Sequence, residues 1–108
     1  MRANVRLLLL ACATTVGCSG YAGPRSVVND DPAVKIPAIK SAVARDDRSA
    51  MAQLVKDLDS DDAAVRFYAV EGLRRIAGET FGYDWIEDDR HARRPAIERW
   101  ERYVAAHP

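Results

Sequence analysis

The stretch that decides the fold runs from Asp59 to Gly78 and reads DSDDAAVRFYAVEGLRRIAG. It is acidic at its start and basic near its end, with apolar residues at helical spacing between. Short oxygen-bearing side chains cap helix N-termini, and their negative charge suits the positive end of the helix dipole. Glycine readily takes the left-handed conformation that ends many helices. The pattern therefore predicts a helix from about Asp62 to Ala77 that stops at Gly78.

This predicted helix is apolar on two sides. Its main stripe consists of Val65, Tyr68, Ala69, Gly72, Leu73 and Ile76, and a second surface consists of Phe67 and Val70. A helix at the edge of a domain needs only one apolar stripe. We therefore expect the helix to pack between neighbours, at the centre of the domain.

Apolar spacing predicts three further helices, and no segment from Asp31 onward shows sustained strand alternation. The expected ranges are Lys35–Arg45, starting near Pro37, then Ser49–Leu58, and finally Pro95–Ala105. Both prolines are placed in a first turn, where the missing N–H donor is harmless. Glu79–Asp89 is expected to be an aromatic loop. The sequence thus predicts an all-α domain of about four helices over residues 32–108.

A short internal repeat appears when the chain is laid over itself at an offset of 31 residues. The aligned positions are Asp31, Ala33, Val34, Lys35, Ala38 and Ile39 on Asp62, Ala64, Val65, Arg66, Ala69 and Val70. A period of about thirty residues with helix pairs is typical of an α-solenoid. No third copy is expected, so the aromatic loop and the last helix would cap a short stack.

The pattern L-x-x-x-L-D-x-x-D-x-x-V-R-x-x-A-x-x-x-L-x-x-I, from Leu54 to Ile76, resembles a HEAT repeat. It is similar to the short HEAT-like repeats of bilin lyases in phycobilisome assembly, and the C-terminal segment is similar to the ending of small bacterial HEAT-repeat proteins. The resemblance covers about Asp31 to Gly78 and implies a short α-solenoid. It further implies that Asp59 or Asp62 forms a structural hydrogen bond with Arg66 across the turn. Gly72 departs from the family, in which alanine is usual.

The N-terminal residues are typical of an export signal. Two arginines precede a short apolar run that ends at Gly17, which predicts a signal peptide over residues 1–17. The stretch T-V-G-C resembles a bacterial lipobox, with Cys18 as the lipidated first residue and residues 18–31 as a tether. Cys12 is a second candidate that leaves a shorter apolar run. The alternative is a secreted protein cut between Gly17 and Gly23.

Composition excludes several functions for the folded part. Without Arg2 and Arg6 the chain would carry 14 basic and 16 acidic side chains, which gives no electrostatic reason to bind nucleic acid. Both cysteines, Cys12 and Cys18, precede the domain, so it has no disulfide or zinc-thiolate site. The histidines His91 and His107 lack a third ligand and a nucleophile partner.

Clusters of charged residues have structural explanations in the sequence. The acidic pairs at Asp46, Asp61 and Asp88 suit helix caps better than catalysis. Asp84 and Glu87–Asp89 could hold calcium, although their spacing is not that of an EF-hand. Residues 90–94 are basic, but acids on both sides favour a solvated mixed-charge face.

The predicted function is the one that is left after catalytic, metal-binding and nucleic-acid-binding functions are set aside. We expect a non-enzymatic protein-interaction module, anchored in the cell envelope by its lipid, that uses no cofactor or metal. Its best binding patch would be the loop aromatics Phe81, Tyr83 and Trp85, if part of them is exposed. The partner protein is unspecified. The alternative, implied only by the repeat, is a bilin-lyase-like enzyme or a chaperone of a chromophore protein.

Overall fold

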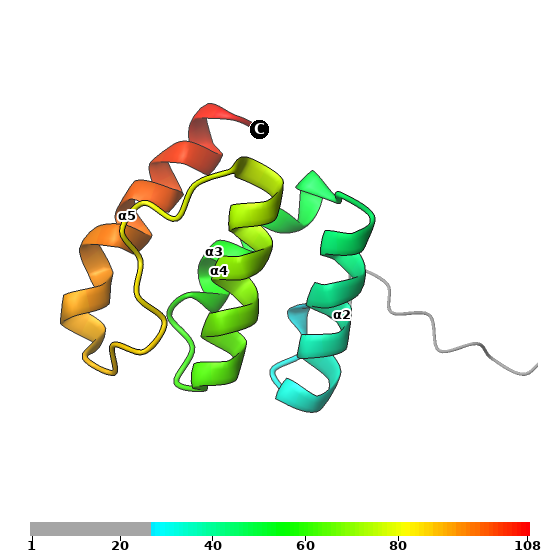
Figure 1. Cartoon of the computed structure of the whole chain (residues 1–108), viewed down its shortest axis with the longest axis horizontal. Coiled ribbons are helices and arrows are strands. Elements are labelled where there is room, and N and C mark those ends of the chain that lie inside the picture. Colours follow the sequence, from blue (N-terminus) through cyan, green and yellow to red (C-terminus); the bar gives the residue numbers. More distant parts are fainter. Residues whose placement is uncertain (1–26) are drawn as a thin grey trace, which may run out of the picture.

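The computed structural model describes residues 27–108 (Figure 1). The helices are α2 (Pro32–Ala44), α3 (Met51–Asp57), α4 (Ala63–Ala77) and α5 (Arg90–Ala106), and a 3₁₀ turn, η1 (Arg48–Ala50), precedes α3. No strand occurs within residues 27–108. The predicted all-α class is therefore confirmed for this part of the chain.

Helix α4 lies at the centre of the packing, where it contacts both α2 and α3. The Asp62 carboxylate accepts the Val65 N–H at 3.0 Å, and Gly78 (φ 79°) donates its N–H to the Arg74 carbonyl at 2.8 Å. A left-handed φ of this size favours glycine, which has no Cβ to clash with the preceding turn. The predicted range, caps and central position of this helix are confirmed.

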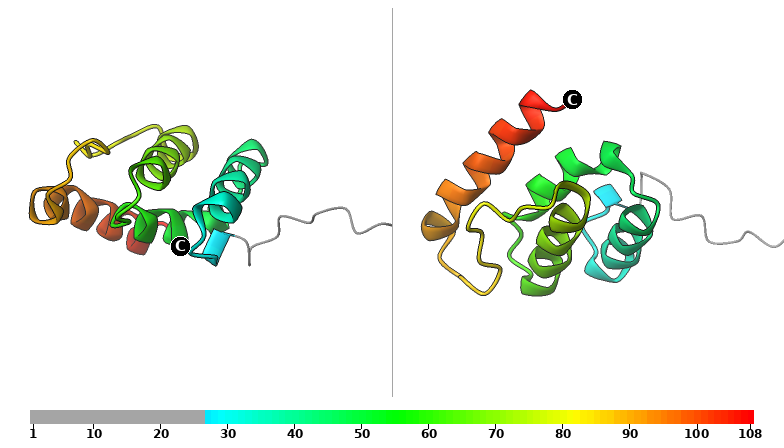
Figure 2. Two further views of the ribbon diagram at one scale, coloured as in Figure 1. Left: turned by 90° about the horizontal axis from the view of Figure 1, so that it is seen from below. Right: turned by 45° about the horizontal axis from the view of Figure 1, so that its top comes forward.

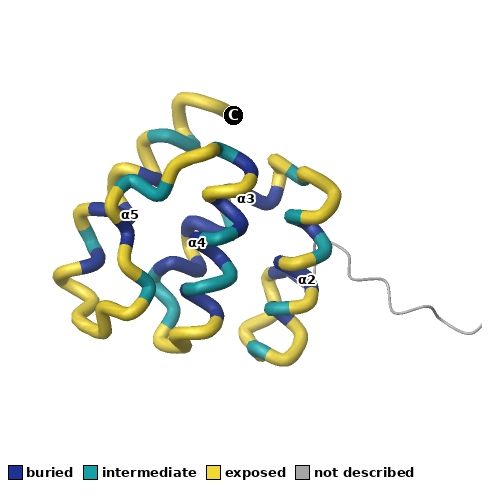
Figure 3. The backbone as a smooth tube through the Cα atoms, viewed as in Figure 1, coloured by how far each residue is buried: buried dark blue, intermediate teal, exposed yellow. Residues whose placement is uncertain are grey.

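The helices form two layers (Figure 2). Helices α2 and α4 lie side by side in one layer, while α3 and α5 contact each other in the other. Buried positions are concentrated in the middle of the molecule, on α3 and α4 (Figure 3), and the largest fully buried apolar side chains are Ile39, Leu54, Leu58, Leu73, Ile97 and Trp100. The indole N–H of Trp100 donates to the Thr80 carbonyl at 3.0 Å, so its burial leaves no unpaired donor.

Helices α2 and α5 begin five residues earlier than predicted, so the expectation that Pro37 and Pro95 occupy first turns is wrong. Asp31 and Asp89 provide the N-caps instead, each accepting a backbone N–H two residues later. Each proline is the sixth residue of its helix, where it removes one helical hydrogen bond. The carbonyls that lose this donor belong to exposed residues, which water can solvate.

The folded domain begins before residue 32. Val27 is buried and packs in the core, although it falls within the stretch expected to be a tether. The predicted signal peptide and Cys18 lie outside the described residues. Across residues 27–108, no helix combines the length and the apolar character needed to cross a membrane.

Gly72 lies at the point where α2 approaches α4 closely. A Cβ on Gly72 would lie 2.7 Å from Cγ2 of Val43 and 3.3 Å from Cδ1 of Leu54. The smaller distance is far inside van der Waals contact, and the β-branched Val43 has few rotamers with which to avoid it. The glycine therefore sets the spacing between α2 and α4.

Candidate interaction surface

Arg66 joins three segments of the chain at the start of α4. Its Nη1 donates to the carbonyls of Ser60 and Asp61 at 2.8 and 3.1 Å, and its Nε donates to the Trp85 carbonyl at 3.0 Å. Its Nη2 bonds to Asp88 Oδ1 at 2.9 Å. Arg66 is only 1% exposed, and its charge is stabilised by oxygen acceptors on three sides. The guanidinium is therefore a structural link between the α3–α4 turn and the α4–α5 loop.

The structure corrects the predicted partners of Arg66. Neither the Asp59 carboxylate nor the Asp62 carboxylate accepts a hydrogen bond from it. Asp62 is already bonded to the N-terminus of α4, and Asp59 instead forms an ion pair with Arg90 of α5 at 3.3 Å. Arg66 is linked to the α3–α4 turn through backbone carbonyls. Its carboxylate partner is Asp88, which belongs to the α4–α5 loop.

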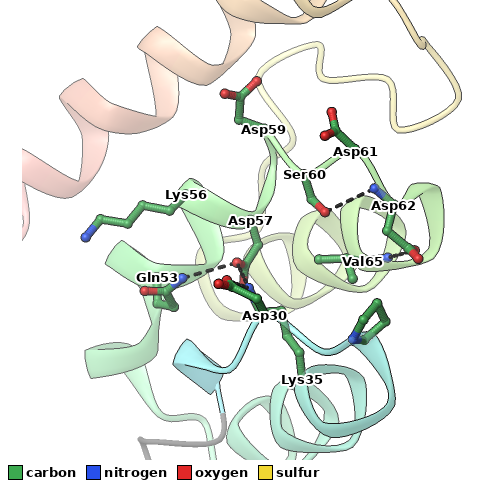
Figure 4. A pocket seen from close by; sticks show the side chains of 11 residues that line it. Asp30, Lys35, Gln53, Lys56, Asp57, Asp59, Ser60, Asp61, Asp62 and Val65 are labelled. Carbon is green, nitrogen blue, oxygen red and sulfur yellow. Dashed lines mark hydrogen bonds and ion pairs between the residues drawn. The ribbon is translucent and has the colours of Figure 1, made fainter.

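Lys35 occupies the position of Arg66 in the preceding repeat copy, and it is also buried. Its ammonium bonds to Asp57 Oδ1 at 2.8 Å, which links α2 to the end of α3. Gln53 donates to the same carboxylate oxygen at 3.1 Å. Burial raises the pKa of Asp57, and the hydrogen bonds from Lys35 and Gln53 oppose that rise. The pair and several exposed acids line a polar hollow of about 450 Å³ (Figure 4).

A third copy of the helix-start motif exists, contrary to the sequence expectation. The pattern D-x-x-x-[K/R]-x-x-A-[I/V] begins at Asp31, Asp62 and also Asp89, where the offset is 27 residues instead of 31. Arg93 repeats the geometry of Arg66, because its Nη1 donates to the Glu87 and Asp88 carbonyls at 2.8 and 2.9 Å. Arg93 is buried, so the expectation that residues 90–94 form only a solvated face is wrong at this position. A search that allowed a shorter offset would have found the motif.

Of the three aromatics predicted to bind a partner, Tyr83 lies in the core. Its side chain is buried, and its hydroxyl donates to the Leu58 carbonyl at 2.6 Å. Phe81 is half-buried and packs edge-to-face on Trp100, with ring centroids 4.7 Å apart. Trp85 is half-buried and packs edge-to-face on Phe67 of α4 at 5.1 Å. Of these three aromatic residues, Trp85 is thus the one that packs against the exposed face of α4.

An apolar groove of about 400 Å³, which the sequence did not predict, lies between α2 and α4 on that face. Phe67, which contacts Trp85, also packs edge-to-face on Tyr68 at 5.2 Å, and both rings line the groove. Val43 and Gly72 contribute to the lining from the two helices. The aromatic residues in this groove are Phe67 and Tyr68, which the sequence assigned to the packing surfaces of α4. Their partial exposure depends on how α2 sits against α4.

The acids of the α4–α5 loop serve local structure. Asp84 accepts the Ile86 N–H, Glu87 accepts the Asp89 N–H, Asp88 pairs with Arg66, and Asp89 caps α5. In residues 27–108, no group of three or more acidic, histidine or cysteine side chains is arranged to hold a metal ion. These bonds give a structural role to each of the acids that were considered as calcium ligands.

Comparison of the chain with protein-family models, with curated proteins and with solved structures finds no match. The candidate surface therefore rests on its own geometry. It consists of the apolar groove and the adjoining row of half-buried rings formed by Tyr68, Phe67 and Trp85.

Proposed function

We propose that this protein is a non-enzymatic protein-interaction module. The observation that supports the proposal is the row of half-buried rings at Tyr68, Phe67 and Trp85, which runs from the α2–α4 groove onto the loop. Partly exposed aromatic side chains beside a groove are typical of protein-binding surfaces, where they provide large contact areas with few rotamers to restrict.

The finer fold that we propose is a short HEAT-like stack. Helices α3 and α4 would form one antiparallel pair, α2 the second helix of the pair before it, and α5 a C-terminal cap. The shared start of α2 and α4 supports this arrangement, since each begins with an aspartate cap followed four residues later by a buried cation, Lys35 or Arg66. Stacked pairs of this kind present grooves between successive helices to their partners.

We also propose that the module is exported and held at a membrane of the cell envelope by a lipid on Cys18. Eight residues separate Cys18 from Val27, the first described residue, and an extended chain of that length reaches about 30 Å. This distance would place the domain beyond the lipid headgroups. Replacing Cys18 with serine should release the protein from the membrane fraction, and unchanged fractionation would exclude the anchor.

A crosslinking pull-down from intact cells tests the interaction itself. The captured candidate partner is then purified, and its affinity for the wild type is compared with that for Trp85→Ala, because Trp85 is exposed enough to contact it. We expect about tenfold weaker binding by the variant. The control is Arg102→Ala, on the exposed side of α5. Failure to obtain any direct partner, or an unchanged affinity, would contradict the assignment.

A bilin-lyase-like enzyme or chaperone remains the second candidate, supported only by the resemblance of the repeat. Its test is a bilin-transfer assay with an apo-phycobiliprotein. Formation of a covalently labelled phycobiliprotein would replace the interaction module with this activity.

A further inference from the structure

The groove between α2 and α4 has an apolar base that the domain does not fill. Ile39 and Gly72 are buried at its base, while Val43, Phe67 and Tyr68 remain half-buried on its walls. The close approach of α2 and α4 at Gly72 sets its depth. Its volume of about 400 Å³ is comparable to that of small binding pockets, but it is open along the surface.

Positive charge outweighs negative charge beside this groove, because the acidic side chain in its lining is paired with an arginine. Glu71 accepts hydrogen bonds from Arg74, the shortest at 2.9 Å, and this pairing lowers the pKa of Glu71. Lys40 on the α2 side and Arg75 on the α4 side form no ion pair with any residue in 27–108, although the Arg75 charge also helps to lower the pKa of Glu71 on the same wall. The Lys40 ammonium lies 5.8 Å from the centroid of the Tyr68 ring, within reach of a cation–π contact. The groove therefore has a cation on each wall.

We infer that this groove binds an amphipathic helix of a partner protein that carries acidic residues beside its apolar face. The inference rests on the proposed interaction function and names the surface and the chemistry of the partner. Apolar side chains of the helix would contact Val43, Phe67 and Tyr68. Glutamate or aspartate on its two flanks would pair with Lys40 and Arg75. Two adjacent helices suit a third helix because their side-chain ridges leave a groove that such a helix can occupy.

Charge complementarity is what selects this occupant. A purely apolar helix would leave both cations without partners, and a basic helix would be repelled by them. A deeply enclosed ligand such as a free fatty acid would need a closed cavity, whereas this groove is open at the surface along α2 and α4. An acidic amphipathic helix satisfies the apolar base and both cations together.

The test uses the purified full-length chain and three fluorescent helical peptides as probes. All three carry leucines along one helical face, and they differ only at the flanking positions, which are glutamate, glutamine or lysine. Fluorescence anisotropy gives each affinity. We expect the glutamate probe to bind about tenfold more tightly than the glutamine probe, as two exposed ion pairs would give. The lysine probe should bind most weakly.

The decisive variant is Lys40→Glu/Arg75→Glu, in which both exposed cations are reversed. It should bind the glutamate probe about tenfold more weakly than the wild type does, and it should prefer the lysine probe. The matched control, Lys56→Glu/Arg102→Glu, makes the same net change at exposed positions outside the groove and should behave as the wild type. Circular dichroism checks that each variant is folded, and Lys40→Gln/Arg75→Gln serves as a milder version.

Several results would overturn the inference. The first is equal affinity for all probes, or an unchanged preference in the charge-reversed variant. The second is that the wild type binds no peptide but self-associates, and that the charge-reversed variant loses this self-association. That result would assign the groove to a second copy of the chain. The third is binding of anionic phospholipid vesicles, but no peptide, that depends on Lys40 and Arg75. If a crosslinked partner binds the charge-reversed variant normally, the interaction function stands and the groove assignment fails.

Discussion

Helices α4 and α5 begin in the same way but are packed differently. Each starts after a capping aspartate, Asp62 or Asp89, and each has a buried arginine four residues later. Arg66 and Arg93 donate in the same manner to the carbonyls five and six residues before them. Yet α4 packs against α2 and α3, while α5 lies in the other layer beside α3.

The difference in packing changes how completely each arginine is satisfied. Arg66 also reaches the Trp85 carbonyl and Asp88, because the α4–α5 loop lies over the start of α4. Arg93 is also buried, but its hydrogen bonds reach only the Glu87 and Asp88 carbonyls. Its Nε is buried without a partner, and Asp59 is 3.8 Å from its Nη2. The same local motif therefore links three segments by hydrogen bonds in α4, whereas in α5 it closes its own turn and adds one longer ion pair, to Asp59 of the α3–α4 turn.

The largest expected effect comes from Arg66→Ala. The substitution leaves the Ser60, Asp61 and Trp85 carbonyls without their donor and removes the partner of Asp88, so we expect a loss of about 4 kcal/mol in the free energy of unfolding. Arg93→Ala should lose about 2 kcal/mol, because fewer groups are left unpaired. Urea unfolding followed by circular dichroism measures both values.

Equal losses in these two variants would show that the loop contacts of Arg66 contribute nothing. Since a domain of this size can have a stability of only about 5 kcal/mol, Arg66→Ala could leave too little folded protein to measure. Arg66→Lys then serves as the second variant. It keeps the charge but cannot form the forked bonds, and it should be intermediate.

The next effect concerns Lys35, whose position matches Arg66 but which donates its hydrogen bond to a carboxylate alone, that of Asp57. Asp57→Ala leaves the buried Lys35 ammonium with only the exposed Asp30 carboxylate, 3.9 Å away, so we expect a loss of about 3 kcal/mol. The double variant Lys35→Met/Asp57→Leu replaces the pair with apolar side chains and should lose about 1 kcal/mol or less. Urea unfolding gives both values, and a double variant that is no more stable than Asp57→Ala would disprove this explanation.

Tyr83→Phe tests how the α4–α5 loop is attached to the end of α3. At neutral pH the variant should lose about 1 kcal/mol, because the buried Leu58 carbonyl loses its donor. Burial raises the pKa of Tyr83 to about 12, whereas an unfolded tyrosine titrates near about 10. The neutral phenol thus contributes stability that is fully present below about pH 10 and is lost as the pH rises towards about 12.

At alkaline pH, the change in stability distinguishes the wild type from Tyr83→Phe. The wild type should lose stability between about pH 10 and about pH 12 by up to roughly 2–3 kcal/mol more than Tyr83→Phe does. Urea unfolding across this range measures the gap. A gap that stays constant with pH would show that Tyr83 ionises as easily in the folded state as in the unfolded state.

The smallest effect is expected for Gly72→Ala, which tests the contact between α2 and α4. Alanine favours a helix by about 1 kcal/mol, but overpacking against Val43 costs about 1–3 kcal/mol, so we expect a net loss of about 1 kcal/mol. The melting temperature should fall by several degrees. Adding Val43→Ala removes the clashing methyl, so the double variant should lose less than the sum of the single variants. A more stable Gly72→Ala would contradict the close contact.

The sequence predicted the fold more completely than it predicted the candidate surface. Apolar period and caps are local signals, and they predicted α4 from end to end. The aromatic loop was also located correctly, but Tyr83 proved to be buried and only Trp85 extends onto the α4 face. Exposure depends on which segments cover a side chain, and periodicity within one helix carries no such information. For this reason the groove beside Phe67 and Tyr68 was missed.

The sequence by itself determined the all-α class and the range and caps of α4, although α2 and α5 begin five residues earlier than predicted. Aspartate caps, apolar spacing and a terminal glycine act within a few residues, so they can be read without knowledge of the rest of the chain. Only the tertiary structure decided which layer each helix joins, which carbonyls Arg66 reaches and where a groove stays open. These features depend on contacts between residues far apart in the chain. This is why Asp62 and Asp89 begin similar helices that have different neighbours.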